Sequence, residues 1–306
     1  MVPPQFHGEP SKNRMTCPTS KLGFGAAQFG LDSAGVGHRG RSPEQEAGDI
    51  LAIAARAGLP VFDASGASAR GESVLGEILP RPNPFRTAIR AARPDRGPDF
   101  IEAEILATLA RMKLQSVDTI LVSSAADLLG PYGAELWDRL RVMKDTGFCR
   151  RIGLSLYASD DPLGMARRFR PDVLQAPASL LDQRLLLDGT LAAVAEMGVE
   201  VHLRSIFLNG LLFLPPDRVP AQLKGAAGRL SRARRMIAEG RSDPLQAALG
   251  FALSRPEASA VLVGVTSSSE MSAVIAAASS PPPDLDWDDM ALDDPVALDP
   301  RRWAAA

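Results

Sequence analysis

Residues 61–76, VFDASGASARGESVLG, give the clearest indication of the fold. The stretch begins as a short apolar run that ends in Asp63, continues through a loop of small residues, and takes on a helical pattern near Glu72. A short, uninterrupted apolar run of this kind is typical of a parallel strand that is covered on both faces. The stretch therefore predicts one strand–loop–helix unit of an α/β protein.

The same unit recurs along nearly the whole chain. Helical patterns follow the apolar runs, and residues 100–114, for example, place Ile101, Ile105 and Leu109 on one helix face. The runs that we interpret as strands are residues 22–27, 61–65, 85–91, 117–124, 151–157, 172–179, 199–207 and 258–266. Such a continuous alternation favours a single-domain (β/α)8 TIM barrel.

An open, doubly wound sheet is the rival architecture. That fold often carries Gly-x-Gly-x-x-Gly after its first strand, and Leu22–Gly25 supplies only the first half of this pattern. We therefore favour the closed barrel over residues 21–280. A flexible N-terminal arm is expected over residues 1–20, and an acidic, Pro/Asp-rich C-terminal tail over residues 281–306.

Composition excludes several classes of partner. The chain has 306 residues, 45% of them hydrophobic and 23% charged, and a net charge of −2, so nothing favours nucleic acid or an anionic membrane. No apolar run approaches the ~18 residues of a membrane span, and the first twenty residues lack the apolar core of a secretory signal. Cys17 and Cys149 form no metal motif, and of the two alternatives, a disulfide between them or two reduced thiols, we favour the reduced thiols. A cytoplasmic location is expected.

Two segments stand outside the alternation. Residues 208–243 contain Pro215-Pro216 and a basic stretch at Arg229–Arg235, and they are either a loop that closes over a ligand or a solvated helix face. The tail after Pro283 is rich in aspartate. It either wraps the barrel, binds a protein partner, or is a mobile tail anchored by one or two aromatic residues, and we favour the last.

The stretch 61–76 resembles the second strand and following loop of the aldo/keto reductases. The resemblance implies a tetrad in which Asp63 matches the family's aspartate. Ser68 stands at the tyrosine position, Arg90 at the lysine position and Ser123 at the histidine position. In the family, the tyrosine gives a proton to the carbonyl oxygen while the cofactor gives hydride to the carbon. A serine hydroxyl is a much weaker acid, so ordinary carbonyl reduction is expected to fall to background.

The resemblance leaves the roles of the remaining mouth residues open. Asp63 and Arg90 form an ion pair that holds the floor of the pocket, or Arg90 grips a ligand carboxylate or phosphate. Tyr157 ends a predicted strand and is either a replacement acid or, as we favour, a structural residue.

The resemblance also implies a cofactor-binding half. The family usually has an asparagine at the position of Ser179, where it contacts the nicotinamide carboxamide, so this contact is weakened here. Glu270 would face the 2′-phosphate of NADPH, so NAD(P) is expected as cofactor without a preference for NADPH. Residues 266–269 form either an anion site or an ordinary helix cap. The implied cofactor-binding residues are Ser155, Gln175, Ser179, Ser205, Phe207, Gly210, Gly264 and Ser267.

Three functional hypotheses follow. The first is a divergent NAD(P)-dependent oxidoreductase, without metal, that acts on a small carbonyl or sugar-like substrate. The second is a catalytically inactive barrel that serves as a nucleotide- or ligand-binding sensor or scaffold. The third and weakest is a lyase or isomerase that uses Asp63 as its base.

Overall fold

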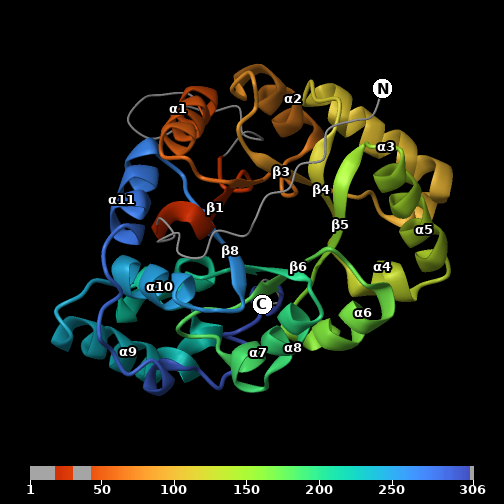
Figure 1. Ribbon diagram of the computed structural model, residues 1–306. Helices are drawn as coiled ribbons and strands as arrows, with labels where there is room; N and C mark the ends of the chain where they lie inside the picture. Colours follow the sequence, from red (N-terminus) through yellow and green to blue (C-terminus); the bar gives the residue numbers. More distant parts are fainter. Residues whose placement is uncertain (1–17, 30–42, 304–306) are drawn as a thin grey trace, which may run out of the picture.

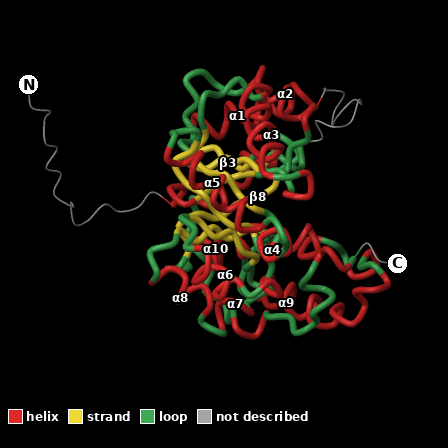
Figure 2. Tube along the Cα trace, turned by 90° about the vertical axis from the view of Figure 1, so that its right-hand side faces the viewer, coloured by secondary structure: helices red, strands yellow, loops and turns green. Residues whose placement is uncertain are grey.

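The protein folds as a closed barrel of eight parallel strands. The computed structural model describes residues 18–29 and 43–303. The strands pair in the order β1 to β8, and β8 pairs with β1 to complete the ring. Helices surround the strands in Figure 1 and lie on both sides of them in the perpendicular view of Figure 2. The predicted (β/α)8 TIM barrel is confirmed, and the doubly wound sheet is excluded.

Each predicted apolar run overlaps one strand; seven of the strands lie entirely within their runs, and β5 begins two residues before the run 151–157. The strands are β1 (Leu22–Gly25), β2 (Val61–Asp63), β3 (Arg86–Arg90), β4 (Val117–Val122), β5 (Cys149–Ser155), β6 (Val173–Pro177), β7 (Glu200–Arg204) and β8 (Ala258–Gly264).

The helices cover the outside of the barrel. Residues 184–196 form two helices instead of one, because Gly189 adopts the left-handed conformation with φ of 76° between them. In the described part of the chain, no helix is long and apolar enough to cross a membrane. The helices are α1 (Pro43–Arg56), α2 (Ala69–Ile78), α3 (Pro98–Arg111), α4 (Ala125–Leu129), α5 (Gly133–Asp145), α6 (Pro162–Phe169), α7 (Arg184–Leu187), α8 (Thr190–Glu196), α9 (Ala227–Glu239), α10 (Pro244–Leu253) and α11 (Ser268–Ala278).

The N-terminal arm expected over residues 1–20 lies outside the described residues, apart from a 3-10 helix that begins at Pro18. Cys17 lies outside them too. Cys149 is buried at the start of β5 with a free thiol, and burial raises the pKa of this thiol to about 11. A thiol with so high a pKa is protonated at neutral pH and is a poor nucleophile.

A second hydrophobic core lies beside the barrel. It joins the insertion, helix α10 and the C-terminal segment, whereas the main core lies between strands and surrounding helices. In Figure 1 the dark blue C-terminal segment runs beside α9. Side chains that are almost fully buried in this second core include Leu211, Leu212, Leu230, Ile237, Met290 and Leu298.

The C-terminal segment therefore differs from the mobile tail that the sequence suggests. The amide of Leu292 donates to the carbonyl of Leu181 at 2.8 Å, which fixes the segment against the barrel. Asp293 and Asp289 pair with Arg229 and Arg232 of α9. The acidic tail and the basic stretch of the insertion are thus partners of each other. A protein partner for the tail stays a prediction.

A network of charged side chains lies at the N-terminal end of the barrel. Arg86 of β3 contacts Glu200 of β7 at 2.6 Å, and Arg151 of β5 bridges Glu200 and Asp118 at 3.2 and 3.1 Å. The His202 ring, whose Nε2 lies 3.5 Å from the Glu200 carboxylate, and the two guanidinium groups lower the pKa of Glu200 to about 2. The network connects four strands whose residues are far apart in the sequence.

We expect this network to stabilise the barrel in a pH-dependent way. The folded-state pKa of Glu200 is lowered from 4.5 to about 2, so its contribution is present above pH 4.5 and is lost as the pH falls towards 2. Glu200→Gln removes the charge that pairs with Arg86 and Arg151. Because Glu200 is only partly exposed, the free energy of unfolding at pH 7 should fall by about 1–3 kcal/mol. Denaturant titrations at several pH values measure this, with the exposed α8 residue Glu196→Gln as control. Parallel stability curves for Glu200→Gln and the unmodified protein between pH 5 and 2 would contradict the assignment.

Candidate functional site

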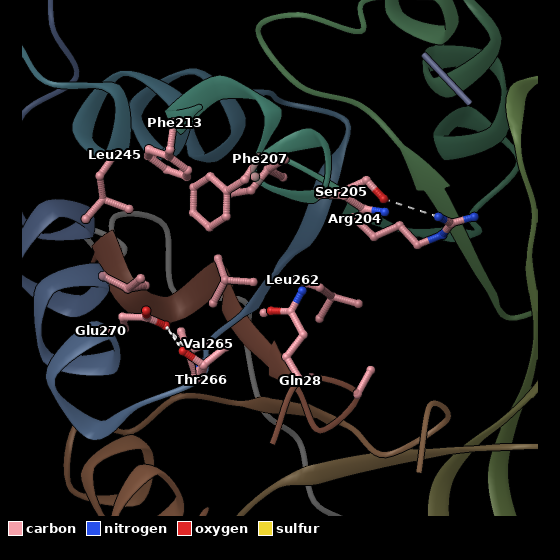
Figure 3. Close-up of a pocket in the computed structure, with 18 of the residues that line it drawn as sticks. Gln28, Arg204, Ser205, Phe207, Phe213, Leu245, Leu262, Val265, Thr266 and Glu270 are labelled. Carbon is pink, nitrogen blue, oxygen red and sulfur yellow. Dashed lines mark hydrogen bonds between the residues drawn. The ribbon is translucent and has the colours of Figure 1, made fainter. Parts of the chain in front are cut away.

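A cavity of about 760 Å³ opens at the C-terminal ends of β7, β8, β1 and β2. Catalytic and binding residues of (β/α)8 barrels lie at this end. Phe207, Phe213 and Leu245 form one wall, and Gln28 and Glu270 lie on the opposite side (Figure 3). The volume lies within the range that is usual for small-molecule sites. The cavity is therefore the candidate functional site.

The structure brings part of the predicted set to the cavity. Asp63, Ser205, Phe207, Gly210 and Gly264 line it. The other predicted residues do not line it, and they are Ser68, Arg90, Ser123, Ser155, Gln175, Ser179 and Ser267. The cavity thus combines one tetrad position with four of the expected cofactor positions.

Asp63 is held in place by neutral donors. Its Oδ1 accepts a hydrogen bond from the amide of Ser65 at 2.8 Å, and its Oδ2 accepts one from the Gln175 side chain at 3.0 Å. Gln175 is buried on β6, so the second bond crosses the barrel mouth. Within the described residues, no ion pair joins Asp63 to Arg90, which is exposed at the end of β3. The expected Asp63–Arg90 pair is wrong, and the buried amide of Gln175 takes its place.

The two serines of the implied tetrad lie outside the wall of the cavity, Ser68 exposed and Ser123 half-buried. Ser68 is exposed and caps helix α2, because its Oγ accepts a hydrogen bond from the amide of Gly71 at 3.2 Å. Ser123 follows β4, and its neighbour Ser124 caps helix α4 in the same way. A hydroxyl that caps a helix is an ordinary structural residue. The loop that would carry the family's tyrosine instead serves as a helix start.

Tyr157 does not supply a replacement acid in the cavity wall. Its ring lies between two guanidinium groups, at 4.2 Å from Arg204 and 3.8 Å from Arg301. Arg204 also donates to the carbonyl of Leu156 at 2.9 Å. This stack joins the C-terminal segment to the end of β7 and is consistent with the structural role that we favour for Tyr157.

Ser179 stabilises the loop after β6. Its Oγ accepts hydrogen bonds from the amides of Leu181 and Asp182 at 3.2 and 3.0 Å, and the residue is almost fully buried. Both bonds lie within the loop, and Ser179 is absent from the wall of the cavity. The local serine turn is therefore the role that the contacts support.

The start of helix α11 is capped by the chain's own side chains. Ser267 caps the helix by accepting from the amide of Glu270 at 3.2 Å. Glu270 in turn accepts from the amide of Thr266 at 2.7 Å, and the amide of Ser268 donates to Glu46, a buried residue of α1. The carboxylates of Glu270 and Glu46 thus accept hydrogen bonds from backbone amides that would otherwise be available to an anion at the start of the helix. Of the two expectations for residues 266–269, the helix cap is the one that these contacts favour.

Gln28 is the principal site residue that the sequence interpretation missed. A side chain at Gly264 would lie 2.1 Å from Oε1 of Gln28, so the absence of a Cβ in β8 makes room for this amide. No hydrogen bond of the Gln28 side chain occurs among the described residues, so the amide remains available to a ligand. Its position just after β1 is a usable signal, because strand ends carry barrel sites. Phe213 and Leu245 come from the insertion and α10, and no local pattern predicts them.

In the described residues, no group of three or more His, Cys, Asp or Glu side chains is arranged to hold a metal ion. The charged groups on the cavity wall are Asp63, Glu270 and Arg204. The Arg204 guanidinium points away from the cavity towards Leu156 and Tyr157 (Figure 3). The wall is otherwise largely apolar, which suits a ligand with ring systems.

Comparisons with known proteins agree with this architecture. The model of the Aldo/keto reductase family matches residues 21–291, so the chain belongs to this family of NAD(P)-dependent oxidoreductases. An aldo-keto reductase from Bacillus halodurans in its holo form is similar, with a TM-score of 0.69, 20% identity, and coverage of 88% of this chain and 89% of that one. A putative aldo-keto reductase from Pseudomonas aeruginosa has a TM-score of 0.62, 18% identity, and coverage of 85% and 90%. No curated protein sequence matches the chain significantly.

Replacement of Ser179 should destabilise the loop after β6. Ser179→Ala leaves two buried amides without their acceptor, so we expect the free energy of unfolding to fall by about 1–3 kcal/mol. Ser155→Ala is the matched control, because the Ser155 side chain makes no hydrogen bond within the described residues, and its effect should stay below about 0.5 kcal/mol. Chemical denaturation measures both, and equal losses for the two variants would argue against the assignment.

Proposed function

We propose that the protein is an NAD(H)-binding member of the aldo/keto reductase family in which ordinary carbonyl reduction has fallen to background. The observation that carries this proposal is a contrast between two neighbouring parts of the barrel mouth, the cavity and the tetrad positions. A large cavity is present over β7, β8 and β1, whereas the neighbouring tetrad positions hold Ser68, Arg90 and Ser123. Binding and proton donation are separate requirements of the reaction, and only the first is met by the residues present.

The residues of the cavity fit a dinucleotide. Phe207, Phe213 and Leu245 offer an apolar wall to a ring system, and Gln28 offers an amide with both a donor and an acceptor. Asn209 and Gly210 have positive φ and line the cavity, but the amide of Gly210 already donates to the carbonyl of Phe207 at 3.0 Å, so the Asn209 side chain is the donor that this turn offers to an anion such as a pyrophosphate. Ser205 adds a hydroxyl at the end of β7. These groups would hold the cofactor from the β7–β8 side of the mouth.

The start of α11 supports discrimination against NADPH. Glu270 stands at the cavity wall, and Glu46 lies buried behind Ser268, so a 2′-phosphate placed here would face two carboxylates and find its amide donors already paired. A ribose hydroxyl, in contrast, can donate a hydrogen bond to a carboxylate. We therefore propose NAD(H) as the preferred cofactor.

Bound NAD(H) supplies a hydride, but the described residues offer no acid that would complete the reduction at the tetrad positions. Ser68 is a weak acid and is used as a helix cap, and the guanidinium of Arg90 does not release its proton. Each Asp63 oxygen already accepts a hydrogen bond from the protein's own donors, which leaves the carboxylate less available to a substrate and disfavours the lyase or isomerase hypothesis. A ligand-binding role as a sensor is thus the second proposal. The small carbonyl or sugar-like substrate remains a prediction.

Cofactor binding is the first test. In calorimetric titrations of the purified protein, NADH should bind more tightly than NADPH by about tenfold or more, since like charges repel the 2′-phosphate. Glu270→Gln should narrow this ratio, whereas the exposed Glu196→Gln should leave it unchanged. Absence of binding of either nucleotide at millimolar concentrations would overturn the proposal, and NADPH binding as tightly as NADH would overturn the preference.

Reconstruction of the tetrad is the second test. The triple variant Ser68→Tyr, Arg90→Lys, Ser123→His should raise NADH-dependent reduction of a panel of small aldehydes by about 10²-fold or more over the unmodified protein, because general acid catalysis contributes about that much. Ser68→Ala with the same two partner substitutions is the control, because it lacks the phenol. Substantial turnover of the panel by the unmodified protein would refute the loss of carbonyl reduction.

A further inference from the structure

The loop that forms one wall of the cavity has a strained backbone. It contains the 3-10 segment η5 (Leu208–Phe213), which follows β7. Three of its residues have positive φ values, which are 58° at Ser205, 48° at Leu208 and 50° at Asn209. Residues other than glycine rarely adopt this region of the backbone. Gly210 continues the run with φ of 85°. Such a backbone persists only where the surrounding structure fixes it.

Arg234 of α9 is one of the groups that fix this loop. Its Nη2 donates to the carbonyl of Leu211 at 2.9 Å, and its Nε donates to the carbonyl of Leu212 at 3.1 Å. The next residue, Phe213, turns its ring towards Phe207, with the ring centroids 5.2 Å apart on the cavity wall (Figure 3). One guanidinium thus holds the two carbonyls that precede an aromatic residue of the wall.

The contacts of Arg234 point to positioning rather than to charge pairing. Within the described residues, no carboxylate lies within ion-pair distance of its guanidinium, and its Nη1 is buried without a partner. Arg234 as a whole is half-buried, and a partly buried cation without a counter-ion is costly, so its retention needs a compensating gain. Two charge-assisted hydrogen bonds to carbonyls of a strained loop supply that gain.

Helix α9 is itself anchored by the C-terminal segment and by the second core, which also contains Leu211 and Leu212 of the loop. Its arginines Arg229 and Arg232 pair with the C-terminal segment, and Leu230 and Ile237 are buried in the second core. Because the surface ion pairs contribute little individually, the buried side chains are the main anchor. A rigid helix therefore carries Arg234 to the loop.

We infer that Arg234 is a positioning residue, which holds the loop Ser205–Phe213 in the conformation that binds the nucleotide, through the carbonyls of Leu211 and Leu212. The inference rests on the proposed function for its ligand. Arg234 itself lies outside the wall of the cavity and therefore acts through the loop. Loss of the guanidinium in Arg234→Met is expected to let the strained loop relax and to weaken nucleotide binding. The packing of the second core should be preserved, because methionine keeps most of the apolar stem of arginine.

The test compares Arg234→Met with Arg235→Met. Arg235 is the adjacent residue, is exposed, and makes no hydrogen bond or ion pair among the described residues. We expect Arg234→Met to weaken NADH binding by about tenfold or more, Arg235→Met by less than about twofold, and Arg234→Lys, which keeps a cationic donor, by an intermediate factor. Calorimetry measures the affinities. Equal NADH affinity of Arg234→Met and the unmodified protein would overturn the inference.

Limited chymotrypsin digestion without nucleotide reports directly on the loop. Chymotrypsin cleaves after aromatic residues, and Phe213 is half exposed. Arg234→Met should be cut at Phe213 several times faster than Arg235→Met, and equal rates would count against the inference. This readout applies even if the unmodified protein binds neither nucleotide, in which case the proposed function fails and the positioning role is judged by cleavage. If Arg234→Met does not fold, Arg234→Lys is used for both measurements. It should also bind NADH more weakly, and be cleaved at Phe213 faster, than Arg235→Met.

Discussion

The pairing of β8 with β1 is the constraint on which the rest of the molecule depends. It joins residues from opposite ends of the barrel sequence, with Gly23 beside Leu262 and Gly25 beside Gly264. A Cβ at Gly23 would lie 2.6 Å from the Leu262 side chain, so the close approach requires glycine. Closure also brings Gln28 over Gly264 and Glu46 of α1 to the start of α11. The wall of the cavity and its negative charge are both consequences of closing the ring.

The second core follows from a different constraint. The insertion after β7 and the C-terminal segment each have too few apolar residues to form a core alone, but together they bury Leu230, Ile237, Met290 and Leu298. The basic and acidic stretches then lie opposite each other at the rim, with Arg229 beside Asp293. Hydrophobic burial supplies most of the stability here, and the exposed charges set the register. The shared core gives the cavity loop a rigid support that the barrel by itself does not provide.

The sequence predicts the barrel well because its signals are local. All eight apolar runs contain strands, since a buried parallel strand has to be apolar wherever it occurs. The site is harder to predict, since its contacts join distant segments. Asp63 is correctly placed at the mouth, but its partner Gln175 lies 112 residues away, and the expected partner Arg90 points to solvent. The tail is hard to predict for the same reason, because its aspartates by themselves indicate disorder, and the arginines of α9 that pair with them lie more than 50 residues away.

The two ends of the barrel show how such a fold can keep its shape while its mouth changes. Strand β3 begins with Arg86, which pairs with Glu200, and ends with Arg90, which is exposed. Strand β7 begins with Glu200 and ends with Arg204, a residue of the cavity wall. Because side chains alternate along a strand, Arg86 and Arg90 share one face of β3, and Glu200 and Arg204 share one face of β7, but only those at the N-terminal end form the cross-strand network. Substitutions at the mouth are therefore expected to leave the network untouched, so that residues of the mouth can change without loss of the fold.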